Sequence, residues 1–451
     1  MSELQGPAWD HLLVGDRVGG GGGYGGIGPG VKINKIPGSA ALTRKDRLCI
    51  NYRWMQEQFG ETHFSFLPDT FNLPEDIPGL GEKMTGDVWV TKPPTGSCGT
   101  GIKLVTDLAQ IQLGKKKLTV QRYITNPFLI NGLKFDLRLY VLLTSIDPVK
   151  IYLYNDGLVR FATKSYSNNE QYFDDKYIHL TNYSINKNND SFQYNEDPTE
   201  FRGHKWSLKT LWKYLENKGF DPVIVNKKIE DLVIKTVLCG QYDIVEAVNS
   251  ELQSDYTCYK LFGVDVLLDQ NLKPWLLELN DFPSLETPTL DRHVNEPMIA
   301  EMFNIVGFHI THKISKNKSK VLSEKYDLKN VKEFDAKLYS REKSLMQRKK
   351  EEYYTREDMP REEYLLLRKG ENLTGRDVRI LVRAEEELAQ TVNFSRLFPC
   401  KDSYKYLDYV EIQSYSDRLL ESWEVAYGDK RSLAMEVLGR LCKAGVHLED
   451  L

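Results

Sequence analysis

Cysteine is scarce in this chain and is not arranged to bind a metal or to form a disulfide framework. The six cysteines lie far apart, with no CxxC spacing and no accompanying His-x-x-x-His pattern. This spacing argues against a structural zinc site and against a disulfide-stabilised secreted fold. Thiols kept apart in this way fit a reducing compartment, so we expect the protein in the cytoplasm.

The chain also lacks a long apolar run. The best candidate, residues 137–146, contains Arg138, Thr144 and Ser145 and falls short of the roughly 20 residues that a membrane-spanning helix needs. Residues 1–10 show no basic start followed by an apolar stretch, so no secretory signal is expected. The sequence therefore predicts no membrane segment.

The overall charge excludes a strongly basic protein of the kind that coats nucleic acid. Lys and Arg number 60 and Asp and Glu number 64, which gives a formal net charge of −4. We therefore expect no nucleic-acid partner. The charge is uneven, however, because residues 313–350 hold 13 Lys or Arg against 5 Asp or Glu, a local charge of +8 that leaves −12 for the rest.

Composition divides the chain into four segments. Residues 1–31 include ten glycines between positions 15 and 30 and cannot bury a core, so a disordered tail is expected. Residues 32–312 alternate short strands and helices, which indicates an α/β or α+β catalytic body. Residues 313–372 form a basic linker, and residues 373–451 show helical spacing of apolar residues after Thr374, a suitable N-cap.

The apolar pattern predicts the individual elements. Runs rich in Val, Ile, Leu and Tyr predict strands at residues 88–91, 118–123, 137–144, 151–154 and 159–162. Helical spacing predicts helices at residues 44–59, 208–218, 223–238, 296–306, 374–392 and 415–445. The segment from 262 to 279 is predicted as a β-hairpin with a polar four-residue loop.

This hairpin carries the first candidate site, a set of oxygen ligands near the strand ends. The expected register places Leu268 opposite Lys273 across the loop. In that register Asp265, Glu278 and Asn280 project from one face, because side chains alternate along a strand. Two carboxylates and an amide are ligands that Mg²⁺ prefers. Ordinary polar residues at strand ends remain the alternative.

A second candidate site is the small-residue loop that follows the strand expected at residues 88–91. Lys92 ends that strand, and Ser97, Gly99 and Gly101 belong to the loop. Glycine lets backbone N–H groups approach phosphate oxygens closely, and a lysine supplies a positive charge. An ordinary surface turn remains the alternative.

Charged residues inside apolar strands form the third candidate site. Lys134, Asp136 and Arg138 fall on one side of a strand, which suits either the ribose and phosphates of a nucleotide or a salt-bridged exposed face. Arg160 lies in another apolar strand. Buried polar groups need partners, so such a cluster implies a network or a ligand. His179 is interpreted as a core histidine.

Taken in order, these motifs resemble the tubulin tyrosine ligase-like family, and most closely its polyglutamylase branch. The resemblance covers about residues 32–312 and also uses the segments GLVRFAT, LTNYSIN and GHKWSLK. Within the branch the chain resembles the glutamylase that starts side chains on tubulin and other acidic proteins. The six ordered motifs are Lys92-Pro93, Gly99-Thr100-Gly101-Ile102, Gln121-Arg122-Tyr123-Ile124, Lys134-Phe135-Asp136-Leu137-Arg138, His179-Leu180-Thr181-Asn182-Tyr183-Ser184 and Glu278-Leu279-Asn280-x-x-Pro283-Ser284.

The resemblance implies an ATP-grasp fold, in which two α/β lobes hold ATP between their sheets, followed by a mostly helical basic extension. It implies that Lys92 contacts the phosphates and that Arg138 faces the γ-phosphate or the activated carboxyl. The residues implied to bind ATP are Lys92, Ser97, Gly99, Gly101, Ile102, Gln121, Arg122, Tyr123, Ile124, Lys134, Asp136, Thr181 and Asn182.

The same resemblance implies a magnesium site, with two ions expected, and a pocket for free L-glutamate. The implied metal ligands are Asp265, Glu278 and Asn280. The implied glutamate-binding residues are Arg160, Tyr183 and Lys205. The residues expected to carry the chemistry are Arg138, Arg160 and Glu278.

The implied reaction joins glutamate to glutamate side chains of acidic tubulin tails or of other acidic proteins. ATP converts the acceptor carboxylate to an acyl phosphate, and the amine of free glutamate then forms an isopeptide bond. Positioning and electrostatic stabilisation carry the rate, so no protein nucleophile is required. The His-Arg-Asp and Asp-Phe-Gly motifs of a protein kinase are absent from the sequence.

The basic segment gains a role from this resemblance. A cationic stretch attracts acidic tails by charge steering, so residues 313–372 are expected to bind microtubules. A solvated helical linker remains the alternative. The resemblance implies a monomer on the microtubule cytoskeleton, with cilia and basal bodies as expected places.

The sequence also departs from the family pattern. Cys98 stands where the family commonly carries Arg, which removes a fixed cation. The Gly-rich tract occupies part of the place of the first lobe and implies a shortened N-terminal lobe. Asp281 and Glu286 are expected to repel an acidic acceptor. These departures favour an alternative function, a catalytically weakened family member that binds microtubules.

Overall fold

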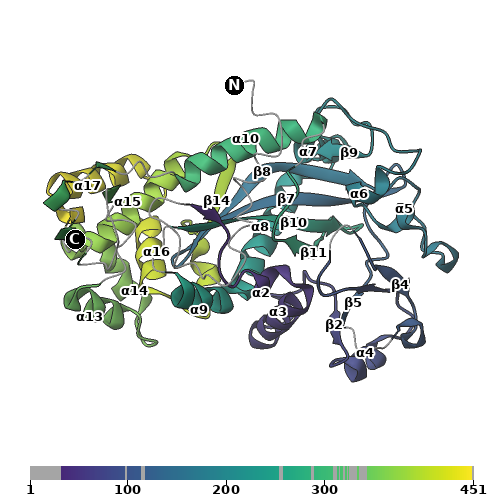
Figure 1. Ribbon diagram of the computed structural model, residues 1–451, viewed down its shortest axis with the longest axis horizontal. Helices are drawn as coiled ribbons and strands as arrows, with labels where there is room; N and C mark the ends of the chain where they lie inside the picture. Colours follow the sequence, from purple (N-terminus) through teal and green to yellow (C-terminus); the bar gives the residue numbers. More distant parts are fainter. Residues whose placement is uncertain are drawn as a thin grey trace.

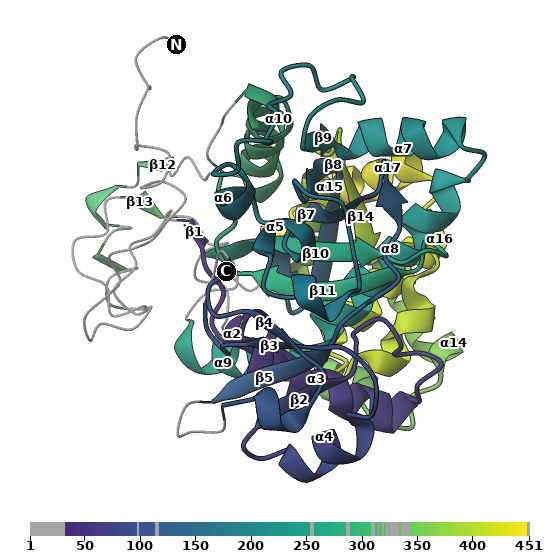
Figure 2. The ribbon, with the colours of Figure 1, turned by 90° about the vertical axis from the view of Figure 1, so that its right-hand side faces the viewer.

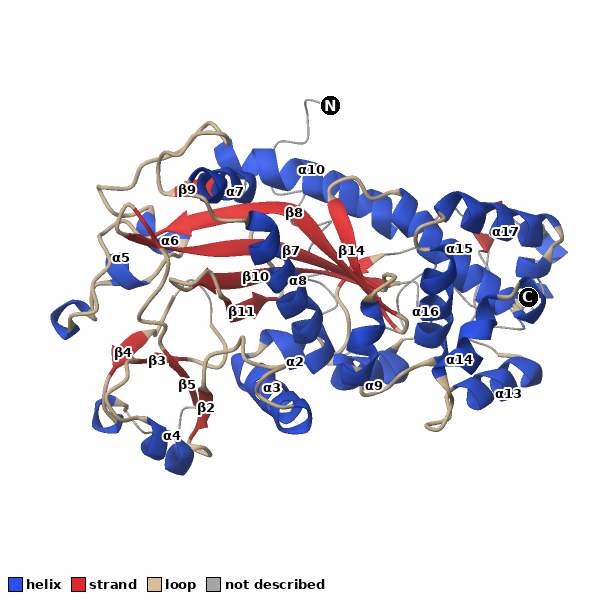
Figure 3. Ribbon diagram, turned by 180° about the vertical axis from the view of Figure 1, so that it is seen from behind, coloured by secondary structure: helices blue, strands red, loops and turns tan. Residues whose placement is uncertain are grey.

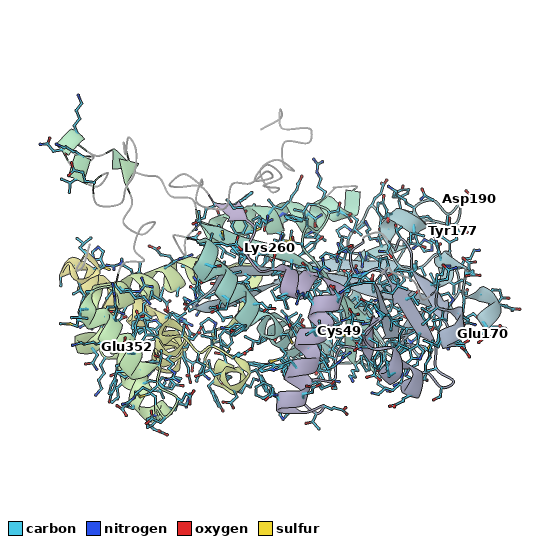
Figure 4. All side chains as sticks on the ribbon, turned by 60° about the horizontal axis from the view of Figure 1, so that its bottom comes forward. Cys49, Glu170, Tyr177, Asp190, Lys260 and Glu352 are labelled. Atoms are coloured by element: carbon cyan, nitrogen blue, oxygen red, sulfur yellow. The ribbon has the colours of Figure 1, made fainter. Side chains whose placement is uncertain are left out.

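A computed structural model describes residues 32–96, 99–112, 117–252, 257–285, 289–307 and 343–448, with a few short pieces between 312 and 334. The predictions for the Gly-rich tail and for most of residues 313–342 lie outside these residues, as do Ser97, Cys98 and Glu286. The molecule is elongated. Figure 4 shows Glu352 toward one end and Glu170, Tyr177 and Asp190 at the other, with Cys49 and Lys260 between them.

A large mixed sheet forms the centre of the molecule (Figure 1). Within the described residues it has eight strands, in the order β1-β10-β7-β8-β14, with β11 paired to β10, β6 to β7 and β9 to β8. Its longest strands, β7 and β8, are rich in Val, Ile, Leu and Tyr and are buried on both faces. The strands are β1 Ile33–Asn34, β6 Leu129–Ile130, β7 Leu133–Ile146, β8 Val149–Phe161, β9 Lys205–Ser207, β10 Cys258–Leu268, β11 Pro274–Asn280 and β14 Phe394–Phe398.

Helices cover both faces of this sheet. The helix α10 runs along one face, where Val294, Met298 and Met302 pack against Tyr140 and Leu142 (Figure 1). The helices α3, α7, α8 and α9 contribute to a larger core on the opposite face. Burial on two faces is the reason that the strands are nearly continuous apolar runs. The helices are α2 Ala40–Thr43, α3 Lys45–Phe59, α5 Lys176–His179, α6 Tyr183–Asn186, α7 Leu208–Asn217, α8 Pro222–Cys239, α9 Gln241–Glu251 and α10 Thr289–Val306.

A smaller antiparallel sheet lies beside the ends of β10 and β11 (Figure 2). Its order is β2-β5-β3-β4, and it has its own core around the fully buried Trp89 and Leu80. Its strands are β2 Thr70–Leu73, β3 Trp89–Lys92, β4 Lys103–Val105 and β5 Leu118–Arg122, and its helix is α4 Ile77–Lys83. The fold is therefore a mixed α/β structure with two sheets, as predicted. A separate two-stranded pair consists of β12 His312–Lys313 and β13 Glu333–Phe334.

Residues 343–448, the described part of the C-terminal region, form helices and the strand β14 (Figure 3). Thr374 caps α15 with a reciprocal hydrogen-bond pair to Asp377, as its position in the sequence predicts. The strand β14 pairs with β8, and Phe398 belongs to the large core of the central sheet. The helices are α13 Leu345–Tyr354, α14 Arg361–Tyr364, α15 Gly375–Ala389, α16 Tyr415–Tyr427 and α17 Arg431–Lys443.

The predicted elements are largely present, with four corrections. The helix expected at 415–445 is divided into α16 and α17, because a turn interrupts it between residues 427 and 431. The strands expected at 151–154 and 159–162 form the single strand β8. The helix expected to begin at residue 296 begins at Thr289. The hairpin register is wrong, because Leu268 lies opposite Pro274 rather than Lys273. The physical reason is a five-residue turn: an oxygen of Asp269 accepts hydrogen bonds from the backbone of Asn271 and Lys273 and draws Lys273 into the loop.

The helices of the described part of the chain are too short or too polar to cross a membrane.

Candidate active site

A cavity lies between the small sheet and the ends of the central strands, and it gathers most of the predicted site residues. The loop after β3, the end of β5, the segment between α5 and α6, and the hairpin of β10 and β11 all contribute to its lining. The predicted residues in the lining are Lys92, Gly99, Ile102, Gln121, Arg122, Tyr123, Ile124, Lys134, Asp136, Thr181, Asn182, Asp265 and Glu278.

A β-bulge brings the two hairpin carboxylates together. The ladder of β10 and β11 shifts next to Asp265, which lies opposite Glu278 and leaves Leu277 as the extra residue. Without this shift Leu277 would lie opposite Asp265, and Glu278 would point to the other face. The amide nitrogen of Asn280 lies 3.3 Å from an oxygen of Asp265. The prediction that all three side chains share one face is therefore confirmed, although the register that motivated it is wrong.

Asp265 is the centre of a buried ion network. Arg138 donates to both of its oxygens at 2.6 and 3.1 Å, and Arg160 lies 2.9 Å from one of them. Arg160 also donates two hydrogen bonds to Asp136 at 2.8 and 2.5 Å. Burial alone would raise the pKa of Asp265, but the charges of the two arginines hold it well below its usual value. The network keeps two guanidinium groups fixed at one side of the cavity.

Two buried lysines form the other cationic part of the cavity. Lys92 donates to the side-chain oxygen of Gln121 at 2.7 Å, and burial lowers its pKa to about 8 against the opposing charge of Glu278. Burial likewise lowers the pKa of Lys134 to about 7, with the charge of Asp136 opposing. Burial has already removed most of the water around both lysines, so the binding of an anion costs little further desolvation of these groups. Both cations therefore suit a phosphate-bearing ligand.

The ring of Tyr123 connects Lys134 to His179. Its hydroxyl accepts a hydrogen bond from Lys134 at 2.9 Å and lies 3.0 Å from Nδ1 of His179. Burial and the charge of Lys134 lower the pKa of His179 to about 4, so the imidazole is neutral at physiological pH. This histidine is buried among aromatic rings, in agreement with its interpretation as a core residue.

Gly99 is required by its surroundings as well as by its backbone. Its φ of 73° favours glycine, and a Cβ there would lie 2.7 Å from the side chain of Ile185. Gly101 has a φ of 74° and a Cβ there would meet Pro93 at 3.2 Å. The loop therefore folds tightly over the rim of the cavity, which allows its backbone to approach a ligand.

Lys45 is a cavity residue that the sequence did not predict. Its Nζ lies 2.9 Å from an oxygen of Glu278, and it begins the helix α3. The signal was weak because Lys45 stands in a helix 233 positions before its partner and belongs to no motif. Its charge offsets that of Glu278 in the same way as the arginines offset that of Asp265.

The donor set of the hairpin fits a hard divalent cation. Two carboxylates and an amide meet on one face, and each carboxylate forms an ion pair with at least one cationic side chain. Oxygen-rich sets with few protein ligands are typical of Mg²⁺. The residues present therefore fit the predicted metal.

The predicted glutamate-binding residues lie around a second, smaller cavity beside the first. Tyr183 and Lys205 line it, together with Asp291 at the start of α10. Nζ of Lys205 lies 3.9 Å from the centre of the Tyr183 ring. The backbone of Lys205, on β9, lies opposite that of Arg160, on β8. Arg160 itself lines neither cavity, but its guanidinium contacts Asp136 and Asp265 at the first cavity, and its backbone lies opposite that of Lys205 at the second.

Asp281, the acidic residue that follows the hairpin, forms an ion pair. Asp281 lies 3.0 Å from Nζ of Lys260, which is buried in β10, and it accepts a hydrogen bond from Ser39 at 3.3 Å. The expectation that Asp281 repels an acidic acceptor is therefore not supported, because its charge is paired.

The family model and the similar proteins that match this chain agree with one another. The family model described as "Tubulin-tyrosine ligase family" matches residues 28–319. The mouse protein named tubulin monoglutamylase TTLL4 is 38% identical over 92% of this chain and 35% of its own length. The Caenorhabditis elegans protein named tubulin polyglutamylase ttll-4 is 34% identical over 93% of this chain and 68% of its own length. The mouse protein named tubulin polyglutamylase TTLL5 is 35% identical over 86% of this chain and 30% of its own length. The chain thus spans about a third of the length of the two mouse relatives.

Proposed function

Because the chain belongs to the tubulin-tyrosine ligase family, we propose that it is an ATP-dependent ligase that attaches glutamate to glutamate side chains of tubulin tails. The observation that carries this proposal is the cavity between the two sheets. It combines two buried lysines, a tight glycine loop and paired carboxylates next to a pair of fixed arginines. The names of the similar mouse and C. elegans proteins support glutamate as the amino acid.

ATP would lie between the two sheets, which is the arrangement of an ATP-grasp fold. Lys92 and the backbone of the loop at Gly99 would contact the phosphates. The strand end from Gln121 to Ile124 would hold the adenine, and Lys134 would contact the nucleotide from the central sheet. Thr181 and Asn182 would complete the nucleotide site from the segment between α5 and α6.

Magnesium would be held by Asp265, Glu278 and Asn280. When bound, the ion supplies charge neutralisation for the phosphates. The chain itself contributes Arg138, which is fixed by Asp265 and faces the place where charge accumulates during phosphoryl transfer.

The reaction has two balanced steps. An oxygen of the acceptor carboxylate bonds to the γ-phosphorus of ATP while the bond to ADP breaks, which gives an acyl phosphate and ADP. The amine of free glutamate then bonds to the acyl carbon, and phosphate leaves. The described site residues bind, orient and neutralise, and none needs to form a covalent bond to the substrate.

The incoming glutamate would occupy the smaller cavity. Its carboxylates would be bound by Arg160 and Lys205, with Tyr183 covering the lysine. Two cations suit a dicarboxylate better than they suit glycine. Supplying labelled glutamate, glycine or tyrosine with Mg-ATP and tubulin tests this selectivity. Glutamate should be incorporated at least about tenfold faster than either competitor, since a lost charge pair costs about 1.4 kcal/mol or more.

ATP affinity should fall as the pH rises through the pKa of Lys92. The protonated lysine attracts phosphate, so binding is strongest below about pH 8 and weakens above it. We expect the affinity for a non-hydrolysable ATP analogue, measured by calorimetry, to drop about fivefold between about pH 7 and about pH 9. A Lys92→Arg variant stays charged and should show a flatter profile. A wild-type affinity that does not change with pH would contradict this assignment.

The acceptor side of the proposal rests on charge. The basic stretch within residues 313–350 would concentrate acidic tubulin tails near the active site, and salt should weaken this attraction. The proposed setting is therefore the microtubule cytoskeleton. The family resemblance adds cilia and basal bodies as settings, and we propose that the enzyme acts as a monomer.

Reversing the charge of Lys316, Lys318 and Lys320 to Glu should reduce microtubule binding. Three charge reversals close to an anionic surface are expected to weaken affinity by about tenfold or more at low salt and by much less at high salt. Co-sedimentation with microtubules at several salt concentrations measures this. Unchanged binding at low salt would remove this patch from the proposal.

A further inference from the structure

Asp291 lines the amino-acid cavity, where it forms an ion pair with Lys205. Its two oxygens lie 2.9 and 2.7 Å from Nζ of Lys205, and both side chains are almost fully buried. The ring of Tyr183 lies against the other side of this lysine at 3.9 Å. The lining of the cavity therefore contains an ammonium and a carboxylate in direct contact.

Three further groups on the central sheet are close enough to Asp291 to interact with it electrostatically. The charges of Arg138 and Arg160, on β7 and β8, act on this carboxylate, and the charge of Asp291 in turn contributes to the raised pKa of Tyr140 on β7. The Tyr140 side chain is fully buried, and its hydroxyl has no hydrogen-bond partner among the described residues. Because buried polar groups are nearly always satisfied, this hydroxyl is available to a ligand or a water.

A neutral pair of opposite charges is complementary to the head group of a free amino acid. The substrate brings one ammonium and one carboxylate on the same carbon, and the cavity offers the reverse. On binding, the two ion pairs exchange partners: Lys205 takes the substrate carboxylate, and Asp291 takes the substrate ammonium. No charge is left unpaired during the exchange, so the desolvation cost that usually opposes burial of charges remains small.

We propose that Asp291 binds the ammonium group of the incoming amino acid and accepts the proton that this nitrogen must lose before it attacks. This inference rests on the proposed ligase function. One proton passes from the ammonium nitrogen to an oxygen of Asp291, which leaves a neutral amine. The nitrogen lone pair forms the C–N bond, the bond from the acyl carbon to the phosphate oxygen breaks, and the phosphate departs with its electron pair and the second proton. Asp291 then returns its proton to solvent.

The electrostatic setting agrees with this role. Burial raises the pKa of Asp291, while the positive charge of Lys205 opposes the rise. A carboxylate that loses its lysine partner to the substrate is a better proton acceptor than one that stays paired. The carboxylate of Asp291 therefore becomes a proton acceptor when the amino acid binds.

Two nucleophiles distinguish this role from a merely structural one. Glutamate enters as an ammonium and needs a proton acceptor, whereas hydroxylamine is largely neutral near neutral pH and traps an acyl phosphate without one. The experiment uses the full chain, Mg-ATP and an acidic tubulin-tail peptide, and it measures glutamyl peptide and hydroxamate separately. The variants are Asp291→Asn and Asp291→Glu, with the exposed Glu296→Gln on the same helix as a control.

We expect Asp291→Asn to slow glutamate ligation by at least about 100-fold near neutral pH while hydroxamate formation stays within about threefold of wild type. The deficit should shrink by about tenfold per pH unit on the alkaline side, as the amine deprotonates in solution. Asp291→Glu should recover part of the rate, and Glu296→Gln should behave as wild type.

An equal loss with both nucleophiles, a deficit that does not change with pH, or normal glutamate ligation by Asp291→Asn would overturn the role of Asp291. The proposed function fails by a different result. If the wild-type chain forms neither glutamyl peptide nor hydroxamate, the chain does not activate carboxylates, and both the ligase proposal and this inference fall.

Discussion

Replacing Asp265 with asparagine is expected to slow glutamate ligation by about 1,000-fold or more. The carboxylate accepts hydrogen bonds from Arg138 and Arg160 and faces Asn280. An amide of the same size keeps one acceptor oxygen but turns an N–H₂ group toward a guanidinium. The substitution also removes one of the two carboxylates in the proposed magnesium site, so it disturbs positioning and metal binding together.

The measurement is the initial rate of labelled-glutamate incorporation into tubulin under saturating Mg-ATP. Asp243→Asn is a matched control, because Asp243 is an exposed residue of α9 that pairs with Asn51 far from the cavity. The near-ultraviolet circular dichroism of the variant shows whether the fold is intact. A folded Asp265→Asn protein that keeps more than about a tenth of the wild-type rate would remove this carboxylate from the chemistry.

The second large expected effect is on the stability of the protein and concerns Glu387, a residue of the C-terminal helices. Replacing Glu387 with glutamine is expected to lower the free energy of unfolding by about 3 kcal/mol or more. Glu387 lies on α15, but its oxygens contact Lys150, Thr144 and Tyr152 of the central sheet at 2.5, 2.8 and 3.2 Å. Lys150 is buried, so the loss of its counter-charge leaves a costly ammonium in the interior.

Urea-induced unfolding compares Glu387→Gln with Glu386→Gln, an exposed neighbour on the same helix. The control should change stability by less than about 0.5 kcal/mol. Burial would raise the pKa of Glu387, but Lys150 and Arg383 lower it to about 2. Its contribution is therefore present above the unfolded pKa of about 4.3 and is lost as the pH falls toward 2. A loss of stability below about 1 kcal/mol would mean that the C-terminal helices are held by other contacts.

This expected effect reflects how the C-terminal region is built into the body of the protein. The strand β14 extends the central sheet, and Glu301 of α10 accepts hydrogen bonds from the backbone of Val392, Asn393 and Phe394 just before and within that strand. On β14 itself, Arg396 lies 2.5 Å from Glu424 of α16. Removal of the residues after 343 would expose one edge of the sheet and part of its core, so a shortened chain is expected to be unstable.

The sequence predicted many of the residues that line the candidate cavity, but not the geometry that joins them. Lys92, Lys134 and Asp265 stand out because charged residues inside apolar runs are costly unless they have partners. Their partners are harder to predict. Lys45 and Asp291 each belong to no motif, and each reaches the site only because a helix from a distant part of the chain begins there. Contacts of this kind depend on tertiary packing, which residue spacing alone does not encode.

The hairpin illustrates the same limit on a smaller scale. Alternation of side chains correctly suggested that Asp265 and Glu278 share a face. The register was nevertheless wrong, because Asp269 draws Lys273 into the turn and a bulge at Leu277 then restores the phase. The longer turn and the bulge each shift the register by one residue, so together they leave the two carboxylates on the same face. Neither irregularity has a strong signature in the sequence composition. The strand β14 was missed for a related reason: its five residues, Phe394–Phe398, form a short segment between two stretches of helical spacing.

The most direct test of the ligase proposal is mass spectrometry of an acidic tubulin-tail peptide after incubation with the full chain, Mg-ATP and glutamate. The account predicts peptides that gain whole glutamyl units on a side-chain carboxyl, with one ADP formed for each unit and no product from a Glu278→Gln variant. A well-folded wild-type chain that binds microtubules and ATP but adds no glutamate would contradict the account and would favour a family member that binds microtubules without catalysis.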